Sequence, residues 1–179
     1  MSLPLETAEG RKAGGQGCLP ILENSHVANV ERSLVILKPD AVQRGLIGEI
    51  VARYEKRGLK IAAMKFETVS RETAARHYGE HEGKPFYEGL VGYITSAPSV
   101  LLVIEGPDAV GIVRKMNGAT KPGEAEPGTI RADFGLTIGR NLVHASDSLE
   151  SAEREVSIFF DEGGIVEYDR AIDTWIIED

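Results

Sequence analysis

The stretch Ser33-Leu34-Val35-Ile36-Leu37 decides the fold, because it is a short apolar run that Lys38-Pro39-Asp40 ends abruptly. A run of this length that stops at a proline is typical of a buried strand. Val100–Ile104 is a second continuous apolar run and predicts a second buried strand. Leu59–Val69, where apolar positions alternate, predicts a third strand, and Leu142-Val143 predicts a short fourth one. We therefore expect a single four-stranded sheet.

Helical signals lie between these predicted strands. Apolar residues recur at helical spacing from Leu46 to Tyr54, and the basic turn Arg57-Gly58 ends the pattern. The other predicted helices start after the cap residue Ser70, cover Pro85–Ile94 and Pro107–Met116, and follow a capping box of Asp147 and Glu150, whereas residues 117–140 are predicted to be a loop. This order predicts an α+β fold: a ferredoxin-like βαββαβ sandwich with a four-stranded antiparallel sheet and helices on one face.

Length, charge and cysteine content exclude several classes of protein. The chain has 179 residues, a formal charge of −8 and one cysteine. The length suits one domain, and the negative charge disfavours binding to nucleic acids or acidic membranes. A single cysteine excludes an intramolecular disulfide framework, and no apolar run approaches the ~20 residues that cross a bilayer. We expect a cytoplasmic protein with no specific nucleic-acid or membrane partner.

The N-terminal segment differs from the rest of the chain. It is polar and rich in glycine, as at Gly14–Gly17, and has neither a helical nor a strand period. We predict a disordered extension over residues 1–29 and one domain over residues 30–179. Val27 is a candidate for an alternative start of translation, and an intact-mass measurement on the native protein tests this.

The densest functional signal lies between Thr129 and Glu155. His144 falls between a strand end and a helix start, where open N–H groups and the helix dipole favour anions. Ser146 and Glu155 lie close enough in the sequence to fix the tautomer and orientation of the imidazole, as nucleophilic catalysis requires. The alternative is a structural histidine that is hydrogen-bonded to a backbone carbonyl.

Three basic residues at the ends of predicted elements form the second signal. Lys38, Arg114 and Arg131 could bind phosphate oxygens, although each alone could equally be a solvated surface charge. Thr120 and Asn141 could join them in this cradle. The chain has no P-loop sequence and no Gly-x-Gly-x-x-Gly after a strand, which disfavours both nucleotide-binding folds of those types.

A pair of histidines, His77 and His81, has the spacing of residues on one helical face. The residues between them, Tyr78-Gly79-Glu80, do not match a zinc-binding helix. We interpret the pair as part of an exposed helical surface.

Three motifs together resemble the nucleoside diphosphate kinase family, and the similarity runs from about Val27 to Asp179. The motifs are Lys38-Pro39-Asp40-Ala41-Val42-Gln43-Arg44-Gly45, Gly128-Thr129-Ile130-Arg131, and the segment from Asn141 through His144, Ser146-Asp147-Ser148 and Glu150-Ser151-Ala152 to Glu155. The joint pattern is far more specific than any single histidine or arginine in it.

The resemblance implies a phosphotransferase that moves the γ-phosphoryl group of ATP to nucleoside diphosphates by a ping-pong mechanism. His144 is then the residue phosphorylated on Nδ1. The other implied site residues are Glu155 and Ser146 beside the imidazole, Lys38 and Tyr78 beside the transferred phosphate, Arg114, Thr120 and Arg131 on the phosphates, Asn141 with Lys38 on the ribose, and Phe86 and Ile138 on the base. The implied cofactor is Mg²⁺, which binds mainly through the nucleotide phosphates and without a direct protein ligand.

The resemblance also implies a homo-oligomer, a hexamer or a tetramer, and broad base specificity, because stacking on Phe86 reads no base edge. Many family members have glycine where this chain has Ala41, Ala132 and Ala145. We expect each alanine to stabilise the fold through the unfolded state if its backbone conformation permits.

Two other functions remain open at this point. Ferredoxin-like sheets also form RNA-recognition modules, but the predicted central strands hold one aromatic residue, Phe66, where such modules need several. The second alternative is a regulatory family member without phosphoryl transfer, which should have lost His144 or its phosphate cradle. This chain keeps both.

Overall fold

The computed structural model describes residues 30–178, so the predicted extension and the Val27 start lie outside it. The strands are β1 (Val30–Leu37), β2 (Lys60–Glu67), β3 (Ser99–Pro107) and β4 (Val143–Ala145). The helices are α1 (Pro39–Gln43), α2 (Ile47–Lys56), α3 (Arg71–His77), α4 (Tyr87–Ile94), α5 (Ala109–Asn117), α6 (Ile130–Phe134) and α7 (Leu149–Phe159). Short 3₁₀ turns cover Gly79–His81, Pro122–Glu124, Glu162–Gly164 and Asp173–Trp175.

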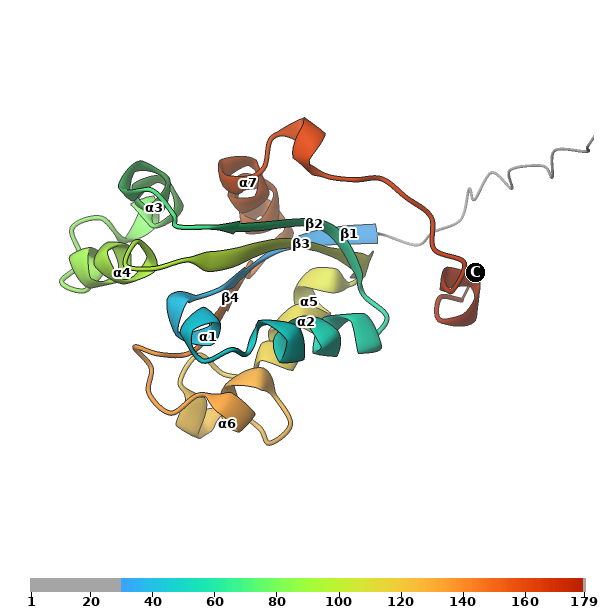
Figure 1. The fold of residues 1–179 in the computed structure, drawn as a ribbon, viewed down its shortest axis with the longest axis horizontal. Coiled ribbons are helices and arrows are strands. Elements are labelled where there is room, and N and C mark those ends of the chain that lie inside the picture. Colours follow the sequence, from blue (N-terminus) through green and yellow to red (C-terminus); the bar gives the residue numbers. More distant parts are fainter. Residues whose placement is uncertain (1–29, 179) are drawn as a thin grey trace, which may run out of the picture.

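The four strands form one sheet in the order β2-β3-β1-β4 (Figure 1). Each pair of neighbours is antiparallel, and the register places Val35 opposite Leu102 on β3 and Ile36 opposite His144 on β4. This strand order with these directions confirms the predicted ferredoxin-like α+β fold. It also makes β4 an edge strand, so the His144 side chain lies at the border of the sheet.

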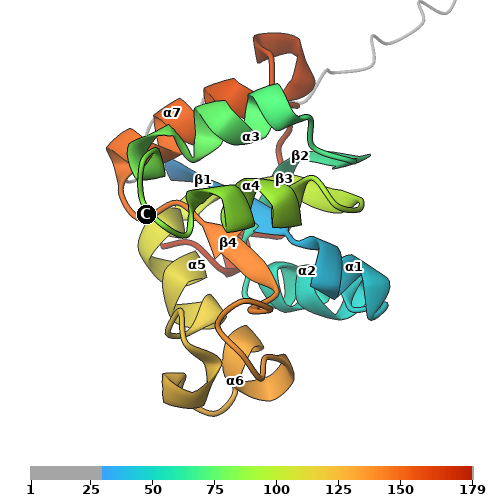
Figure 2. The same ribbon diagram turned by 90° about the vertical axis from the view of Figure 1, so that its left-hand side faces the viewer.

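Helices cover both faces of the sheet, so the prediction of helices on one face is wrong. Leu34 and Ile36 pack into a core with α3, α4 and α7, whereas Val35 and Leu37 pack into a second core with α1, α2, α5 and α6 (Figures 1 and 2). All four side chains are fully buried. Side chains alternate between the two faces of a strand, so a continuous apolar run needs cover on both.

Two predicted helix starts are displaced. Pro107 is the last residue of β3, and Asp108, with a left-handed φ of 47°, caps α5 instead. The cap of α7 is Ser148, whose side chain forms a capping box with Ser151 and not the predicted Asp147 with Glu150. The side chains of Asp147 and Ser148 can both accept from the free N–H groups of a first helical turn, so sequence spacing alone did not choose between these two residues.

The predicted loop over residues 117–140 contains a short helix. Thr129 caps α6 by accepting a hydrogen bond from the N–H of Ala132. Ser70 caps α3 in the same way, by accepting a hydrogen bond from the N–H of Thr73, and this cap was predicted. Helix α6 has five residues, too few for a visible apolar period. Its formation brings Arg131 against the end of β4.

The C-terminal segment lies along the start of β2. The N–H of Val166 donates to the carbonyl of Ala62, and the Arg170 guanidinium donates to the carbonyls of Gly58 and Leu59. None of the helices within residues 30–178 is long and apolar enough to cross a membrane.

Candidate active site

The chain enters β4 through a residue in an unusual conformation. Leu142 is fully buried and has a φ of 69°, which non-glycine residues rarely adopt. Its N–H donates to the carboxylate of Asp40 at 3.0 Å, and its carbonyl accepts from the N–H of Lys38 at 2.8 Å. The segment after β1 therefore fixes the backbone two residues before His144, and strain held in this way is typical of functional sites.

Glu155 and Ser146 hold the imidazole of His144 from one side. Nε2 of His144 lies 3.1 Å from each carboxylate oxygen of Glu155, and the Ser146 hydroxyl donates to the same carboxylate at 2.7 Å. The Ser146 oxygen in turn accepts from the N–H of Leu34 on β1 at 3.1 Å. A carboxylate accepts and never donates when ionised, so this network assigns the imidazole proton to Nε2 and leaves a lone pair on Nδ1.

The carboxylate of Glu155 stays ionised although it is buried. Burial alone raises the pKa of Glu155, but the hydrogen bonds from His144 and Ser146 outweigh burial and hold the pKa below its usual value. The side chain of His144 keeps 24% of its surface exposed, against 6% for Glu155. A fixed negative charge thus lies behind a half-buried imidazole, where it can stabilise positive charge that develops on the ring.

Hydrogen bonds link Lys38, which follows β1, to Asn141, which precedes β4, and Asn141 to Thr120. Nζ of Lys38 donates to the side-chain oxygen of Asn141 at 2.8 Å, and the amide of Asn141 donates to the carbonyl of Thr120 at 2.9 Å. Burial, with a smaller contribution from Arg131, lowers the pKa of Lys38 to about 8. The ammonium group is therefore charged at neutral pH and has no hydrogen-bonded carboxylate in residues 30–178.

Arg131 is buried and holds three backbone segments together. Its guanidinium donates to the carbonyls of Gly118 at 2.7 Å, Val143 at 2.7 Å and Asn141 at 3.3 Å. Burial lowers the pKa of Arg131, and repulsion from the nearby Arg114 adds to this. A guanidinium has five N–H donors, so Arg131 can position β4 and still offer donors to a ligand, while Arg114 lies exposed at the end of α5.

A row of aromatic rings leads from His144 to the surface. Tyr78 is 8% exposed, and its ring is stacked on His81 with centroids 6.4 Å apart. The His81 ring meets Phe86 edge-on at 5.6 Å, and Phe86 is 52% exposed. Ile138, the last of the predicted site residues, is 62% exposed in the turn between α6 and β4. Two separate segments thus present exposed apolar side chains.

His77 is buried beside His144, so its interpretation as part of an exposed helical surface is wrong. Its side chain is 2% exposed, and its ring meets the ring of His144 edge-on with centroids 4.7 Å apart. Burial, with repulsion from His144, lowers the pKa of His77 to about 3, so the ring is neutral. Ala74, three residues earlier on the same face of α3, is also buried. This helical spacing from an apolar residue is the signal in the sequence that could have predicted a buried His77.

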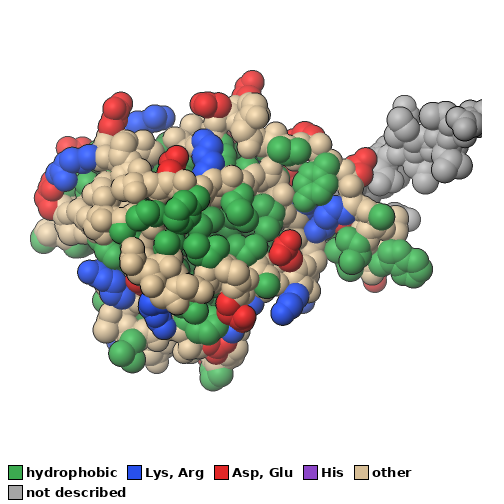
Figure 3. Space-filling view, in the orientation of Figure 1, with side chains coloured by type: hydrophobic (Ala, Val, Ile, Leu, Met, Phe, Trp, Pro, Cys, Tyr) green, Lys and Arg blue, Asp and Glu red, His purple; other side chains and the backbone are tan. Residues whose placement is uncertain are grey.

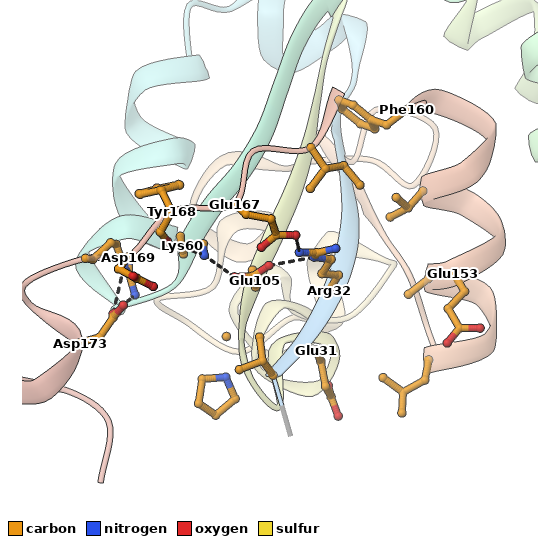
Figure 4. A pocket seen from close by; sticks show the side chains of 18 of the residues that line it. Glu31, Arg32, Lys60, Glu105, Glu153, Phe160, Glu167, Tyr168, Asp169 and Asp173 are labelled. Carbon is orange, nitrogen blue, oxygen red and sulfur yellow. Dashed lines mark hydrogen bonds and ion pairs between the residues drawn. The ribbon is translucent and has the colours of Figure 1, made fainter. Parts of the chain in front are cut away.

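A cavity of about 950 Å³ lies elsewhere, between β1, β3, α7 and the C-terminal segment (Figure 4). Arg32 and Lys60 both bind the carboxylate of Glu105 there, at 2.8 and 2.5 Å, and Arg32 also pairs with Glu167. These two cations already have carboxylate partners, so they do not favour an added phosphate.

Comparisons with known proteins show which proteins this chain is similar to. Residues 31–165 match the model of a family described as nucleoside diphosphate kinase. The chain is 58% identical over 149 residues to a nucleoside diphosphate kinase of Desulforamulus reducens. The aligned residues cover 83% of this chain and all of that protein. It is 60% identical over 151 residues to a nucleoside diphosphate kinase of Chloroflexus aurantiacus, with the same coverage.

Two solved structures are similar to this fold. A halophilic nucleoside diphosphate kinase from Halobacterium salinarum in complex with CDP has a TM-score of 0.82 and 49% identity, over 84% of this chain and all of that one. A nucleoside diphosphate kinase family protein from Babesia bovis has a TM-score of 0.80 and 45% identity, over 82% of this chain and 99% of that one.

Proposed function

This chain belongs to the nucleoside diphosphate kinase family, and from that premise we propose that it transfers the γ-phosphoryl group of ATP to a nucleoside diphosphate through a phosphohistidine on His144. One observation carries the proposal: Glu155 binds Nε2 of His144 at 3.1 Å and thereby leaves the lone pair on Nδ1. A neutral imidazole with a fixed tautomer is a competent nucleophile at neutral pH.

In the first step, the Nδ1 lone pair attacks the γ-phosphorus and forms the N–P bond. The bond from phosphorus to the bridging oxygen breaks, and its electron pair leaves with ADP. The phosphorylated ring keeps its Nε2 proton and gains positive charge, which the carboxylate of Glu155 stabilises across the 3.1 Å contact. In the second step, a terminal phosphate oxygen of the acceptor diphosphate attacks the same phosphorus and forms the new O–P bond. The N–P bond breaks, and its electron pair returns to Nδ1, which restores the neutral ring.

The phosphates bring negative charge that the chain must offset. Lys38, Arg114 and Arg131 supply positive charge around the Asn141 amide, and phosphoryl transfer depends mainly on positioning and charge compensation. Mg²⁺ prefers oxygen ligands in octahedral geometry and keeps several waters. The side chains that meet here are mainly nitrogen donors, so we propose that Mg²⁺ is carried by the nucleotide phosphates, whose charge it lowers.

Base recognition in this proposal rests on stacking. Phe86 offers an exposed ring, and Ile138 supplies an apolar side chain for the other face of the base. Neither side chain can bond to a base edge, so we expect purine and pyrimidine nucleotides to be accepted. Lys38 and Asn141 could instead bind the ribose hydroxyls, which favours an intact sugar.

We also propose that the chain forms a homo-oligomer, a hexamer or a tetramer. β2 is an edge strand of the sheet: among residues 30–178 its outer side contacts the C-terminal segment at Ala62, and farther along the strand Met64 and Phe66 have 51% and 62% of their surfaces exposed. Hydrophobic side chains gather over β2 and β3 on the face drawn in Figure 3. Light scattering coupled to size exclusion measures the assembly. The cytoplasmic location stays a prediction from composition.

Brief incubation with γ-labelled ATP and Mg²⁺ tests the proposed chemistry. We expect a label on the protein that is stable in alkali and labile in acid, and that GDP or CDP discharges as labelled triphosphate. His144→Ala should abolish the label, while the matched variant His81→Ala should keep it. Label that persists in His144→Ala contradicts the proposal, and a wild-type protein without label would be a regulatory family member.

A further inference from the structure

The buried imidazole of His77 has no assigned partner in the site. Neither Nδ1 nor Nε2 of His77 has a hydrogen-bond partner within residues 30–178, although the side chain is only 2% exposed. Buried polar atoms almost always have a partner, so an unsatisfied pair of ring nitrogens calls for a physical explanation such as a bound ion. Nδ1 of His77 lies 3.9 Å from the carboxylate of Glu155, which is too far for a hydrogen bond but close enough for both groups to bind one ion.

His77, His144 and Glu155 together form the ligand set of a transition metal. One ligand atom from each lies within 4.8 Å of the other two. Three atoms with this spacing all lie within about 2.8 Å of one central point, where a metal ion would sit. Each ligand atom would therefore have to move less than about 1 Å toward this point to reach the 2.0–2.2 Å of Zn²⁺ bonds. Two histidines and one glutamate are a known zinc set, whereas Mg²⁺ prefers oxygen.

We propose that His77, His144 and Glu155 bind Zn²⁺ and that the bound ion switches the nucleophile off. The metal would take Nε2 of His144, the nitrogen that now donates to Glu155. A neutral imidazole that is bound to a metal through Nε2 carries its proton on Nδ1. The proton therefore moves from Nε2 to Nδ1, and no proton is released.

Inhibition follows from this change of tautomer. The lone pair that attacks the γ-phosphorus is on Nδ1, and a protonated Nδ1 has none to offer. Zn²⁺ at this position would lie between His77, His144 and Glu155, whereas the proposed function assigns the phosphates to other side chains, Lys38, Arg114 and Arg131. The ion should thus lower kcat and leave the KM for nucleotides unchanged, whereas Zn²⁺ that merely competes as its ATP complex would raise KM. The inhibitory effect rests on the proposed function, but the binding of Zn²⁺ does not.

His77→Phe is the sharpest variant. It removes both ring nitrogens and keeps an aromatic side chain against Tyr78 and Phe159, whose rings lie 4.5 and 5.3 Å from that of His77. No hydrogen bond is lost, since His77 makes none among the described residues. The melting temperature should therefore stay the same or rise. His77→Asn serves as a second variant if His77→Phe folds poorly, and His81→Phe is the matched control outside the metal set.

Zinc binding is measured on untagged protein by competition with a chromophoric chelator. We expect one Zn²⁺ per chain in the wild type and in His81→Phe, and binding that is about 100-fold weaker or more in His77→Phe. Co²⁺, used as a spectroscopic probe, should give the strong visible bands of a four-coordinate site in the wild type and in His81→Phe but not in His77→Phe. Equal zinc binding by wild type and His77→Phe would overturn the proposal.

Kinetics test the consequence of binding separately. With saturating Mg²⁺ and nucleotides, Zn²⁺ should lower kcat of the wild type and its labelling by γ-labelled ATP, and a zinc-selective chelator should restore both. His77→Phe, compared with its own zinc-free rate, should lose this sensitivity. Inhibition that excess nucleotide overcomes would overturn the tautomer switch. A protein that binds zinc but never forms a labelled histidine would refute the proposed kinase chemistry and leave the metal site standing.

Discussion

Two buried glutamates, Glu105 on β3 and Glu155 on α7, have the same side chain and different partners. Glu105 is 7% exposed and lies between Arg32 and Lys60, whereas Glu155 is 5% exposed and accepts from His144 and Ser146. Both keep a lowered pKa against the effect of burial. Permanent cations saturate the charge of Glu105, while neutral donors leave the charge of Glu155 free to act on a ring that becomes positive. The first arrangement suits stability and the second suits catalysis.

Glu155→Gln is expected to give the largest effect. The substitution keeps the shape and removes the charge behind the imidazole, so kcat should fall about 100-fold or more while the KM for nucleotides changes little. Steady-state kinetics with ATP and GDP measure this, with a thermal melt to confirm the fold. If kcat stays within about threefold of the wild type, the charge of Glu155 has no catalytic role and the contrast with Glu105 fails.

Glu105→Gln should produce the opposite pattern. Two cations lose their partner, so the free energy of unfolding should fall by about 2 kcal/mol, reduced from the buried-pair range because Arg32 is partly exposed. Urea unfolding at one protein concentration measures it, and kcat should stay within about twofold. The lowered pKa of Glu105 means that its contribution is present above about pH 4.3 and is lost as the pH falls through the folded-state value. The wild type and the variant should therefore converge in acid, and a constant difference would count against this account.

The surroundings of the two glutamates also differ in their lysines: Lys60 pairs with the carboxylate of Glu105, whereas Lys38 is hydrogen-bonded to the amide of Asn141. The pKa of Lys38 is about 8, so its ammonium group predominates below that pH and is lost above it. We expect kcat/KM for nucleotides to fall about fivefold between pH 8 and pH 9, because the charged fraction of Lys38 falls by this factor.

A pH profile checks this, with Lys60→Gln as the control that keeps the alkaline decline. Lys38→Met should have a lower kcat/KM with no decline near pH 8. A wild-type profile that stays flat to pH 9.5 would show that the charge of Lys38 is not needed.

Ala145→Gly, next to His144, should have the smallest effect, because it removes a single methyl group. Ala145 is 8% exposed, and positive φ values among the non-glycine residues of the described chain occur only at Asp108 and Leu142. The backbone at Ala145 therefore suits alanine, and glycine should lower the free energy of unfolding by about 0.4–1 kcal/mol. A thermal melt measures it, and an unchanged or higher melting temperature would mean that alanine adds no stability there.

The sequence predicted the contact between His144 and Glu155 better than it predicted the layers. The roles proposed for these two residues come from a joint motif, and the hydrogen bond between them spans only 11 residues. The link from Leu34 to Ser146 spans 112 residues, and no local pattern carries it. The same limit explains His77, which shares α3 with buried and exposed residues alike and becomes part of the site only when α3 packs beside α7.

The sequence by itself determined the strands and the family and proposed the nucleophile, because apolar runs and motifs are local properties of the chain. Only the tertiary structure decided that both sheet faces are covered, that Arg131 holds the end of β4, and that His77 lies 4.7 Å from His144. These contacts depend on strand register and helix packing, which bring together residues far apart in the sequence. The same carboxylate group can therefore bind two cations at Glu105 and an imidazole and a hydroxyl at Glu155, where we propose a catalytic role for it.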